Sequence, residues 1–155
     1  MTPGVLKICV CIILLRITFA GRLDGALQMT EDVPVIYVIF NAIPGFTRAN
    51  IHLAALKNTV YVIYDMKDKN IGKLMASVAS SPRVSLFPMA RYKEGADAFA
   101  SIYTHLCPDK TPQRQRQELM NFQRFFVLRD FVEHHHLTRV FYGDGDVSVF
   151  GNMTA

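Results

Sequence analysis

Four short and strongly apolar segments constrain the fold of this chain more than any other feature. They are rich in Val, Ile, Tyr and Phe, as buried strands are, and cover residues 33–40, 59–64, 83–87 and 139–142. Helical patterns lie between them, at residues 50–57, 71–79, 96–106 and 111–136. Near-continuous apolar strands that alternate with helices indicate a parallel sheet covered on both faces. We therefore expect an α/β fold, with a Rossmann-like, mostly parallel sheet and helices on both faces.

The last helix has the clearest boundaries. Thr111-Pro112 predicts its start, because a hydroxyl can cap a helix and proline is favoured at the first helical position. Three histidines, His134 to His136, close it. Consecutive helical residues point about 100° apart, so three adjacent histidines do not converge on one metal ion. We expect a solvated helix terminus, where histidine complements the helix dipole.

Two carboxylates, Asp144 and Asp146, stand between apolar runs near the end of the sequence. Carboxylates are rarely buried without a partner or a metal, so we expect both at the carboxyl edge of the last strand, where open α/β sheets bind ligands. The strand period of two places them on one face, from which their oxygens can converge on a divalent cation. Oxygen ligands favour Mg²⁺ or Mn²⁺ over Zn²⁺. The alternative is a solvated turn around Gly145.

Polar residues also end two earlier strands. Asn41 follows the first strand and Asp65 the second. With right-handed crossovers, both lie at the same sheet edge as Asp144. Asn41 and Asp65 are then candidates to hydrogen-bond a nucleotide base or ribose, while Asp144 and Asp146 hold the metal and a diphosphate. The alternative for each is ordinary polarity at a strand end.

Length and charge narrow the class of protein. The chain has 155 residues, half of them hydrophobic, which suits one domain with a sizeable core. Its net charge of +4 is spread along the sequence and suits an anionic ligand such as a phosphate. No Lys/Arg-rich block with interleaved aromatic residues occurs, so we do not expect nucleic-acid binding.

Residues 1–20 differ from the rest of the chain. A basic start, a short apolar run and a small residue at Ala20 predict a signal peptide or signal anchor, and hence entry into the secretory pathway. The run is shorter than the roughly 20 apolar residues that span a bilayer, and Arg16 interrupts it, so an ordinary buried strand or helix is the alternative. We expect a linker at residues 21–32 and the α/β domain at 33–155. A glycosylation sequon at Asn152 is compatible with a lumenal domain, and membrane anchoring through the first segment is possible.

A family resemblance rests on three segments. Tyr103-Thr104-His105, the helical sequence from Glu118 to Phe131, and Arg139-Val140-Phe141-Tyr142-Gly143-Asp144-Gly145-Asp146-Val147 resemble nucleotide-diphospho-sugar glycosyltransferases of the GT-A fold. In that family a helix with an arginine and aromatic residues leads into a strand ending Tyr-x-Asp-x-Asp-Val. The resemblance implies metal-dependent transfer of a sugar from a nucleotide-diphospho-sugar donor to an acceptor, a glycan or protein of unknown identity.

The resemblance also assigns roles to residues. Asp144 and Asp146 would bind Mn²⁺ or Mg²⁺ bridging the donor diphosphate, with Asp146 the more direct ligand and Asp144 also near the ribose. Arg124 would orient the donor or the aspartates; otherwise it is a surface arginine with a buried stem. Gly143 replaces a bulky apolar residue, so we expect the strand to fray or bulge before Asp144. The sequence stops nine residues after Asp146, where the family continues, which predicts the donor half of a larger domain.

Two other functions remain open. Asp144-Gly145-Asp146-Val147-Ser148-Val149 also resembles the nucleophile loop of haloacid-dehalogenase-type phosphatases, in which the first aspartate attacks phosphorus. That loop normally opens its domain, with a lysine and more acidic residues far downstream. The second is a non-catalytic remnant that binds a nucleotide or a partner chain without turnover.

Overall fold

A computed structural model describes residues 32–40, 43–65, 81–105 and 111–154, and the single positions 72, 76 and 78. Its four strands are β1 (Val35–Ile39), β2 (Val60–Tyr64), β3 (Val84–Pro88) and β4 (Phe141–Gly143). They form one sheet in the order β3-β2-β1-β4, in which every pair is parallel. The predicted parallel α/β fold is confirmed. The predicted leader at 1–20, almost all of the linker, Asn41 and most of the helix at 71–79 lie outside the described residues.

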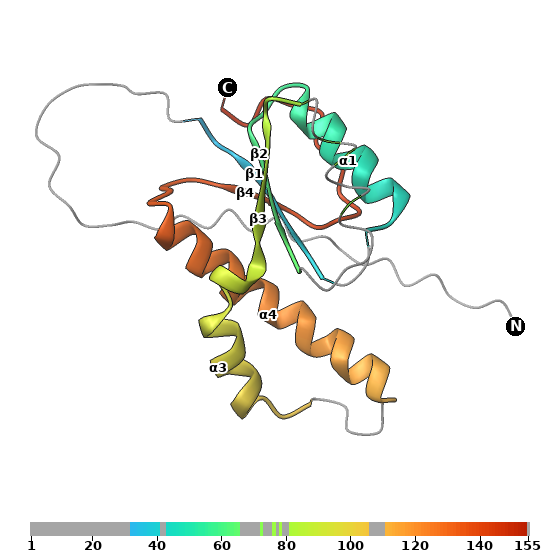
Figure 1. Ribbon diagram of the computed structural model, residues 1–155, viewed down its shortest axis with the longest axis vertical. Coiled ribbons are helices and arrows are strands. Elements are labelled where there is room, and N and C mark those ends of the chain that lie inside the picture. The colour runs from blue at the N-terminus through green and yellow to red at the C-terminus, as the bar shows by residue number, and fades with distance from the viewer. Residues whose placement is uncertain are drawn as a thin grey trace, which may run out of the picture.

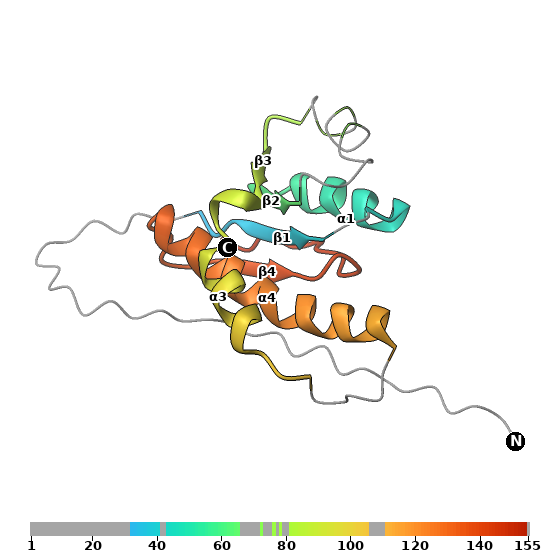
Figure 2. The ribbon, with the colours of Figure 1, turned by 60° about the horizontal axis from the view of Figure 1, so that its bottom comes forward.

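Helices cover both faces of the sheet (Figures 1 and 2). Helix α1 (Gly45–Ala55) lies on one face, and α3 (Glu94–Ile102) and α4 (Pro112–His134) lie on the other. Alternate side chains of β1 divide between the two layers: Tyr37 packs into the core on the α1 side, and Ile36 packs into the core under α4. Because both faces are covered, the strands carry unbroken apolar runs instead of an alternating pattern.

Only the carboxyl half of α4 packs into the core. Its buried residues are Val127, Leu128, Phe131 and Val132. Phe131 sits in an aromatic cluster with Tyr61, Phe87 and Tyr92, with ring centroids 5.0–5.8 Å away. Fully burying a side chain of this kind contributes roughly 1.5–3 kcal/mol. The amino half of α4 continues past the sheet (Figure 1), and this half supplies residues to the candidate site.

Some helix boundaries differ from the sequence prediction. Helix α1 begins at Gly45, five residues earlier than predicted, and Pro44 precedes it at the N-cap position with an extended backbone, φ −57° and ψ 155°. The predicted loop at 89–95 contains a 3₁₀ turn, η1 (Met89–Arg91), and α3 begins at Glu94. Helix α4 starts as predicted after Thr111, although the Thr111 side chain makes no capping hydrogen bond. Among the described residues, none of the helices has the length and apolar character needed to cross a bilayer.

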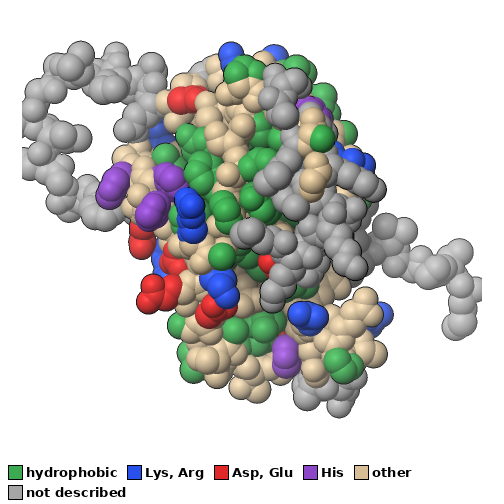
Figure 3. Space-filling view, viewed as in Figure 1, with side chains coloured by type: hydrophobic (Ala, Val, Ile, Leu, Met, Phe, Trp, Pro, Cys, Tyr) green, Lys and Arg blue, Asp and Glu red, His purple; other side chains and the backbone are tan. Residues whose placement is uncertain are grey.

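Charged side chains are mixed on the surface. On the face shown in Figure 3, Lys and Arg side chains lie among Asp and Glu side chains and form no large basic patch. This mixture matches the spread of charge along the sequence.

Helix α4 ends in a Schellman-type turn. The Leu137 amide donates to the Val132 carbonyl at 3.0 Å, and the His136 amide donates to the Glu133 carbonyl at 3.2 Å. His136 takes the left-handed conformation with a φ of 53°. The His135 ring packs on Phe131 and contacts the Tyr92 hydroxyl at 3.0 Å. Burial, with His134 and His136 nearby, lowers the pKa of His135.

The left-handed residue gives a stability test. Replacing His136→Gly should raise the free energy of unfolding by about 0.5–1 kcal/mol, because glycine adopts positive φ without the cost that a Cβ imposes. Urea denaturation measures the change. His134→Gly, two residues earlier at the last position of α4, is the matched control and should lower stability by up to about 1 kcal/mol. A loss of stability in His136→Gly would contradict the assigned conformation.

Candidate metal and diphosphate site

Asp144 and Asp146 belong to a tight turn that directly follows β4. The Val147 amide donates to the Asp144 carbonyl at 2.8 Å, which closes the turn. The predicted position of the two aspartates on one strand face is wrong, because β4 ends at Gly143. Both side chains nevertheless line one cavity, of about 290 Å³.

This cavity lies at the carboxyl edge of the sheet, where β1 and β4 end beside the amino half of α4 and the start of α1. Its walls combine apolar and polar residues: Val38, Ile39, Phe40, Pro44, Phe46, Thr47, Gln117, Met120, Asn121, Arg124, Asp144, Gly145 and Asp146. The position matches the edge predicted for Asp144. Open α/β sheets bind their ligands at this edge.

Helix α1 holds the turn through a buried asparagine. Asn50 donates from Nδ2 to the Gly145 carbonyl at 3.1 Å, and its Oδ1 accepts the Ser148 hydroxyl at 2.6 Å. Thr47 packs against Gly145, where a Cβ would lie 3.0 Å from the Thr47 hydroxyl oxygen. Neither residue was predicted to belong to the site. Helical spacing could have identified them, since Thr47 and Asn50 fall on the buried face of α1 that Ile51 and Ala54 share.

Strand β1 holds the turn through Tyr37. The Tyr37 hydroxyl donates to the Val147 carbonyl at 3.3 Å, and burial raises the pKa of Tyr37 to about 12, which keeps the hydroxyl protonated. Its ring crosses Gly143, where a Cβ would lie only 2.9 Å from the Tyr37 Cε1. The prediction that β4 frays or bulges is wrong: Gly143 pairs in register with Tyr37. Glycine is accommodated here because it leaves room for the ring.

Arg124 places the positive charge of its guanidinium beside the same turn. Its Nη1 donates to the Asp144 Oδ2 at 2.6 Å and to the Tyr142 hydroxyl at 3.3 Å, and its Nη2 donates to the Asn121 Oδ1 at 2.6 Å. The Nε is buried and has no hydrogen-bond partner among the described residues. Burial acts to lower the pKa of Arg124, but Tyr142 and Asp144 raise it above its ordinary value. Burial, foremost, raises the pKa of Tyr142 to about 12, so Arg124 is charged and Tyr142 is neutral.

Of the other two predicted site residues, only Asp65 lies within the described residues, and it is apart from the aspartate turn. Asp65 follows β2 at the same edge, but it lines a neighbouring cavity of about 490 Å³. Phe40 and Met120 line both cavities, so the two are adjacent. Asn41 lies outside the described residues, and its predicted role stays a prediction.

The chemistry of the aspartate turn fits a hard divalent cation. Asp144 and Asp146 are exposed carboxylates, and Asp144 Oδ1 accepts a hydrogen bond from the neighbouring Gly145 amide at 3.0 Å. The described residues include no group of three His, Cys, Asp or Glu side chains placed to hold a metal. Mg²⁺ is commonly held by one or two carboxylates together with substrate phosphates and water. The residues present therefore fit a cation that shares its ligands with a bound phosphate.

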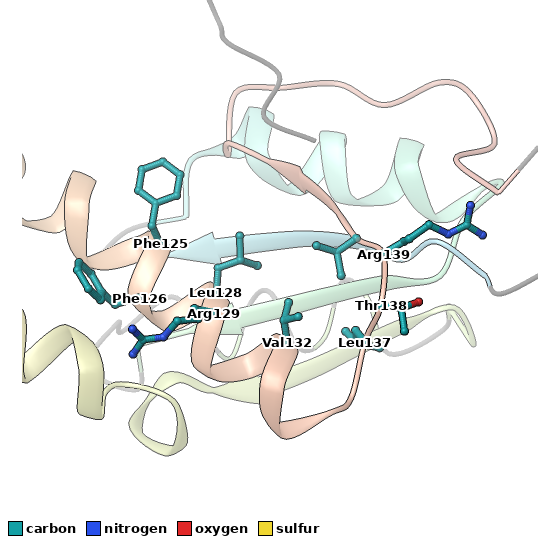
Figure 4. A pocket seen from close by; sticks show the side chains of 9 residues that line it. Phe125, Phe126, Leu128, Arg129, Val132, Leu137, Thr138 and Arg139 are labelled. Atoms are coloured by element: carbon teal, nitrogen blue, oxygen red, sulfur yellow. The ribbon is translucent and has the colours of Figure 1, made fainter. Parts of the chain in front are cut away.

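A second pocket has different chemistry (Figure 4). It has a volume of about 250 Å³ and lies between the carboxyl half of α4 and residues 137–140, which precede β4. Its lining is largely apolar, including Leu128, Val132 and Val140, with Arg129 and Arg139 among the lining residues. No carboxylate lines it, so it does not share the features of the aspartate turn.

Comparison with known proteins finds no matching family model, no matching curated protein and no matching solved structure. The chemistry of the cavity is therefore the basis for assigning a function.

The contact between Tyr37 and Gly143 can be tested directly. Gly143→Ala should lower the free energy of unfolding by about 1–3 kcal/mol, because the fully buried Tyr37 ring cannot move aside without repacking the core. Gly45→Ala is the matched control, since its added Cβ would meet only Arg48 Nη2 at 3.9 Å. Thermal unfolding compares the two variants. Equal melting temperatures for Gly143→Ala and the unmodified protein would contradict the close contact.

Proposed function

We propose that this chain is the donor-binding region of a metal-dependent nucleotide-diphospho-sugar transferase. Asp144 and Asp146 would hold Mn²⁺ or Mg²⁺, which would supply positive charge to the diphosphate of the donor. One observation carries the proposal: both carboxylates and the Arg124 guanidinium face a single cavity at the carboxyl edge of the sheet. The acceptor is a glycan or a protein.

The charges of the cavity suit a cation–diphosphate pair. Two carboxylates attract the cation, and one guanidinium can donate to phosphate oxygens, for which arginine geometry is well matched. When bound, the cation neutralises charge on the departing nucleoside diphosphate as the sugar–phosphate bond breaks. The task of this chain is to bind and orient the donor.

The two adjacent cavities suit a ligand with two chemically different parts. The smaller, at about 290 Å³, lies near the lower limit for a small-molecule pocket, and the larger, at about 490 Å³, extends it past Phe40 and Met120. Under this proposal the diphosphate occupies the aspartate cavity. The ribose and base occupy the second cavity, which Asp65 lines.

Calorimetric titration tests this function. Uridine or guanosine diphosphate should bind the unmodified protein in the presence of Mn²⁺ and at least about tenfold more weakly without it, because each charge contact at such a site contributes on the order of 1–3 kcal/mol. The double variant Asp144→Ala/Asp146→Ala should lose the Mn²⁺-dependent part. Glu133→Ala, which removes an exposed carboxylate at the far end of α4, should bind normally. If the double variant bound the nucleoside diphosphate with Mn²⁺ as tightly as the unmodified protein, the result would contradict the proposed site.

Turnover separates the alternatives. A glycosyltransferase needs a nucleotide-sugar and should release the nucleoside diphosphate slowly even to water, whereas a phosphatase would hydrolyse a simple phosphomonoester. A non-catalytic nucleotide binder would show Mn²⁺-dependent affinity with neither activity. Mass spectrometry of the products distinguishes the three outcomes.

We also propose that residues 1–20 direct the chain into the secretory pathway, in the Golgi or endoplasmic reticulum lumen or to the outside. The support is the basic start, apolar run and small residue of that segment, with an exposed Asn152 in a glycosylation sequon. Protein isolated from secretory cells should begin near Gly21 if the segment is cleaved. It should remain membrane-associated if the segment is an anchor. A soluble cytosolic protein that retains Met1 would contradict the proposal.

A further inference from the structure

Arg124 and a bound cation would use the same carboxylate. The guanidinium donates to Asp144 Oδ2 at 2.6 Å, and the other oxygen, Oδ1, accepts from the Gly145 amide at 3.0 Å. A cation on Asp144 would therefore lie within a few ångströms of a permanent positive charge. Like charges at such separations repel, and the repulsion is stronger in a partly buried setting than in bulk water.

Arg124 cannot avoid this conflict by losing its proton, because arginine stays charged in proteins. Its side chain is also well buried, at 17% exposed, whereas that of Asp144 is 51% exposed, so solvent screens the arginine poorly. Asn121 and Tyr142 anchor the guanidinium on its other sides. The repulsion is relieved when an anion arrives that binds both positive groups.

A donor for such an anion is already in place. Arg124 lines the aspartate cavity, and its Nη2 carries two N–H groups, of which the Asn121 Oδ1 accepts from one. A diphosphate in the aspartate cavity can accept from the guanidinium and also ligate the cation. Its negative charge offsets the repulsion between Arg124 and the cation, so each ligand favours binding of the other.

We propose that Arg124 couples the two binding events: it weakens binding of the divalent cation to the empty site and makes tight cation binding dependent on a diphosphate. This inference rests on the proposed function and adds a regulatory role for one residue. Coupling between two ligands is a free energy shared by both, so the cation should strengthen diphosphate binding by the same factor.

Calorimetry of the full chain with Mn²⁺ alone, and with Mn²⁺ plus uridine diphosphate, tests the coupling. Arg124→Gln should bind Mn²⁺ alone about tenfold more tightly than the unmodified protein, and the enhancement by uridine diphosphate should shrink by about the same factor. Arg124→Lys keeps the charge and should resemble the unmodified protein in Mn²⁺ affinity. Arg129→Gln is the matched control, because it removes a positive charge from α4 that pairs with Asp130 and should leave both affinities unchanged.

The outcomes separate this inference from the function on which it rests. If Arg124→Gln binds Mn²⁺ no more tightly while Asp144→Ala/Asp146→Ala loses it, the coupling role is wrong and the site stands. If the unmodified protein binds neither Mn²⁺ nor its diphosphate complex, the proposed function is wrong as well. If Arg124→Gln does not fold, the test is made on the unmodified protein. The coupling is wrong if uridine diphosphate leaves the Mn²⁺ affinity of the unmodified protein unchanged.

Discussion

The central strand β1 is the constraint on which this structure depends. It pairs with β2 on one side and β4 on the other, and all five of its residues are buried. Because both pairings are parallel, the carboxyl ends of three strands meet at one edge. Tyr37 extends this role beyond the core, since its ring crosses Gly143 and its hydroxyl reaches the turn of Asp144 and Asp146. The same strand thus determines both the fold and the position of the candidate site.

The site separates the groups that would bind a ligand from the groups that position them. Asp144 and Asp146 are exposed, whereas Asn50 and Tyr37 are buried and Arg124 is largely so. A buried polar group left without a partner costs about 1–3 kcal/mol, so each buried donor is a strong restraint on the turn. The turn is accordingly held from α1, β1 and α4 at once, and two exposed carboxylates remain directed at the cavity.

Side-chain hydrogen bonds also hold the segment that follows the turn. Asn58, which is fully buried, donates to the Gly151 carbonyl at 2.9 Å and accepts the Met153 amide at 2.7 Å. Thr154 accepts the Val33 amide at 2.9 Å, next to the start of β1. Residues 144–154 therefore run back across the α1 side of the sheet, where Val149 is part of the core. They belong to the folded unit and form one of its layers together with α1.

The fold could be predicted from the sequence because hydrophobic patterning acts locally and additively. Four apolar runs and the strong boundaries of α4 were sufficient for the parallel sheet and its two covered faces. The position of Asp144 at a strand end followed from the cost of burying a carboxylate. The fit of Tyr37 over Gly143 and the role of Asn50 could not be derived, because each depends on a contact between segments about a hundred residues apart. The start of α1 was missed because Pro-Gly serves equally well in a turn and at the first step of a helix.

Paramagnetic broadening of backbone amide signals by Mn²⁺ tests the central claim most directly, because it locates the cation without relying on turnover. With uridine diphosphate present, the amides of Gly145 and Val147 should broaden first, while those of the apolar pocket around Val132 and Val140 remain sharp. Broadening centred on the histidines at the end of α4, or spread evenly over the surface, would contradict a cation site at the carboxyl edge of β1 and β4.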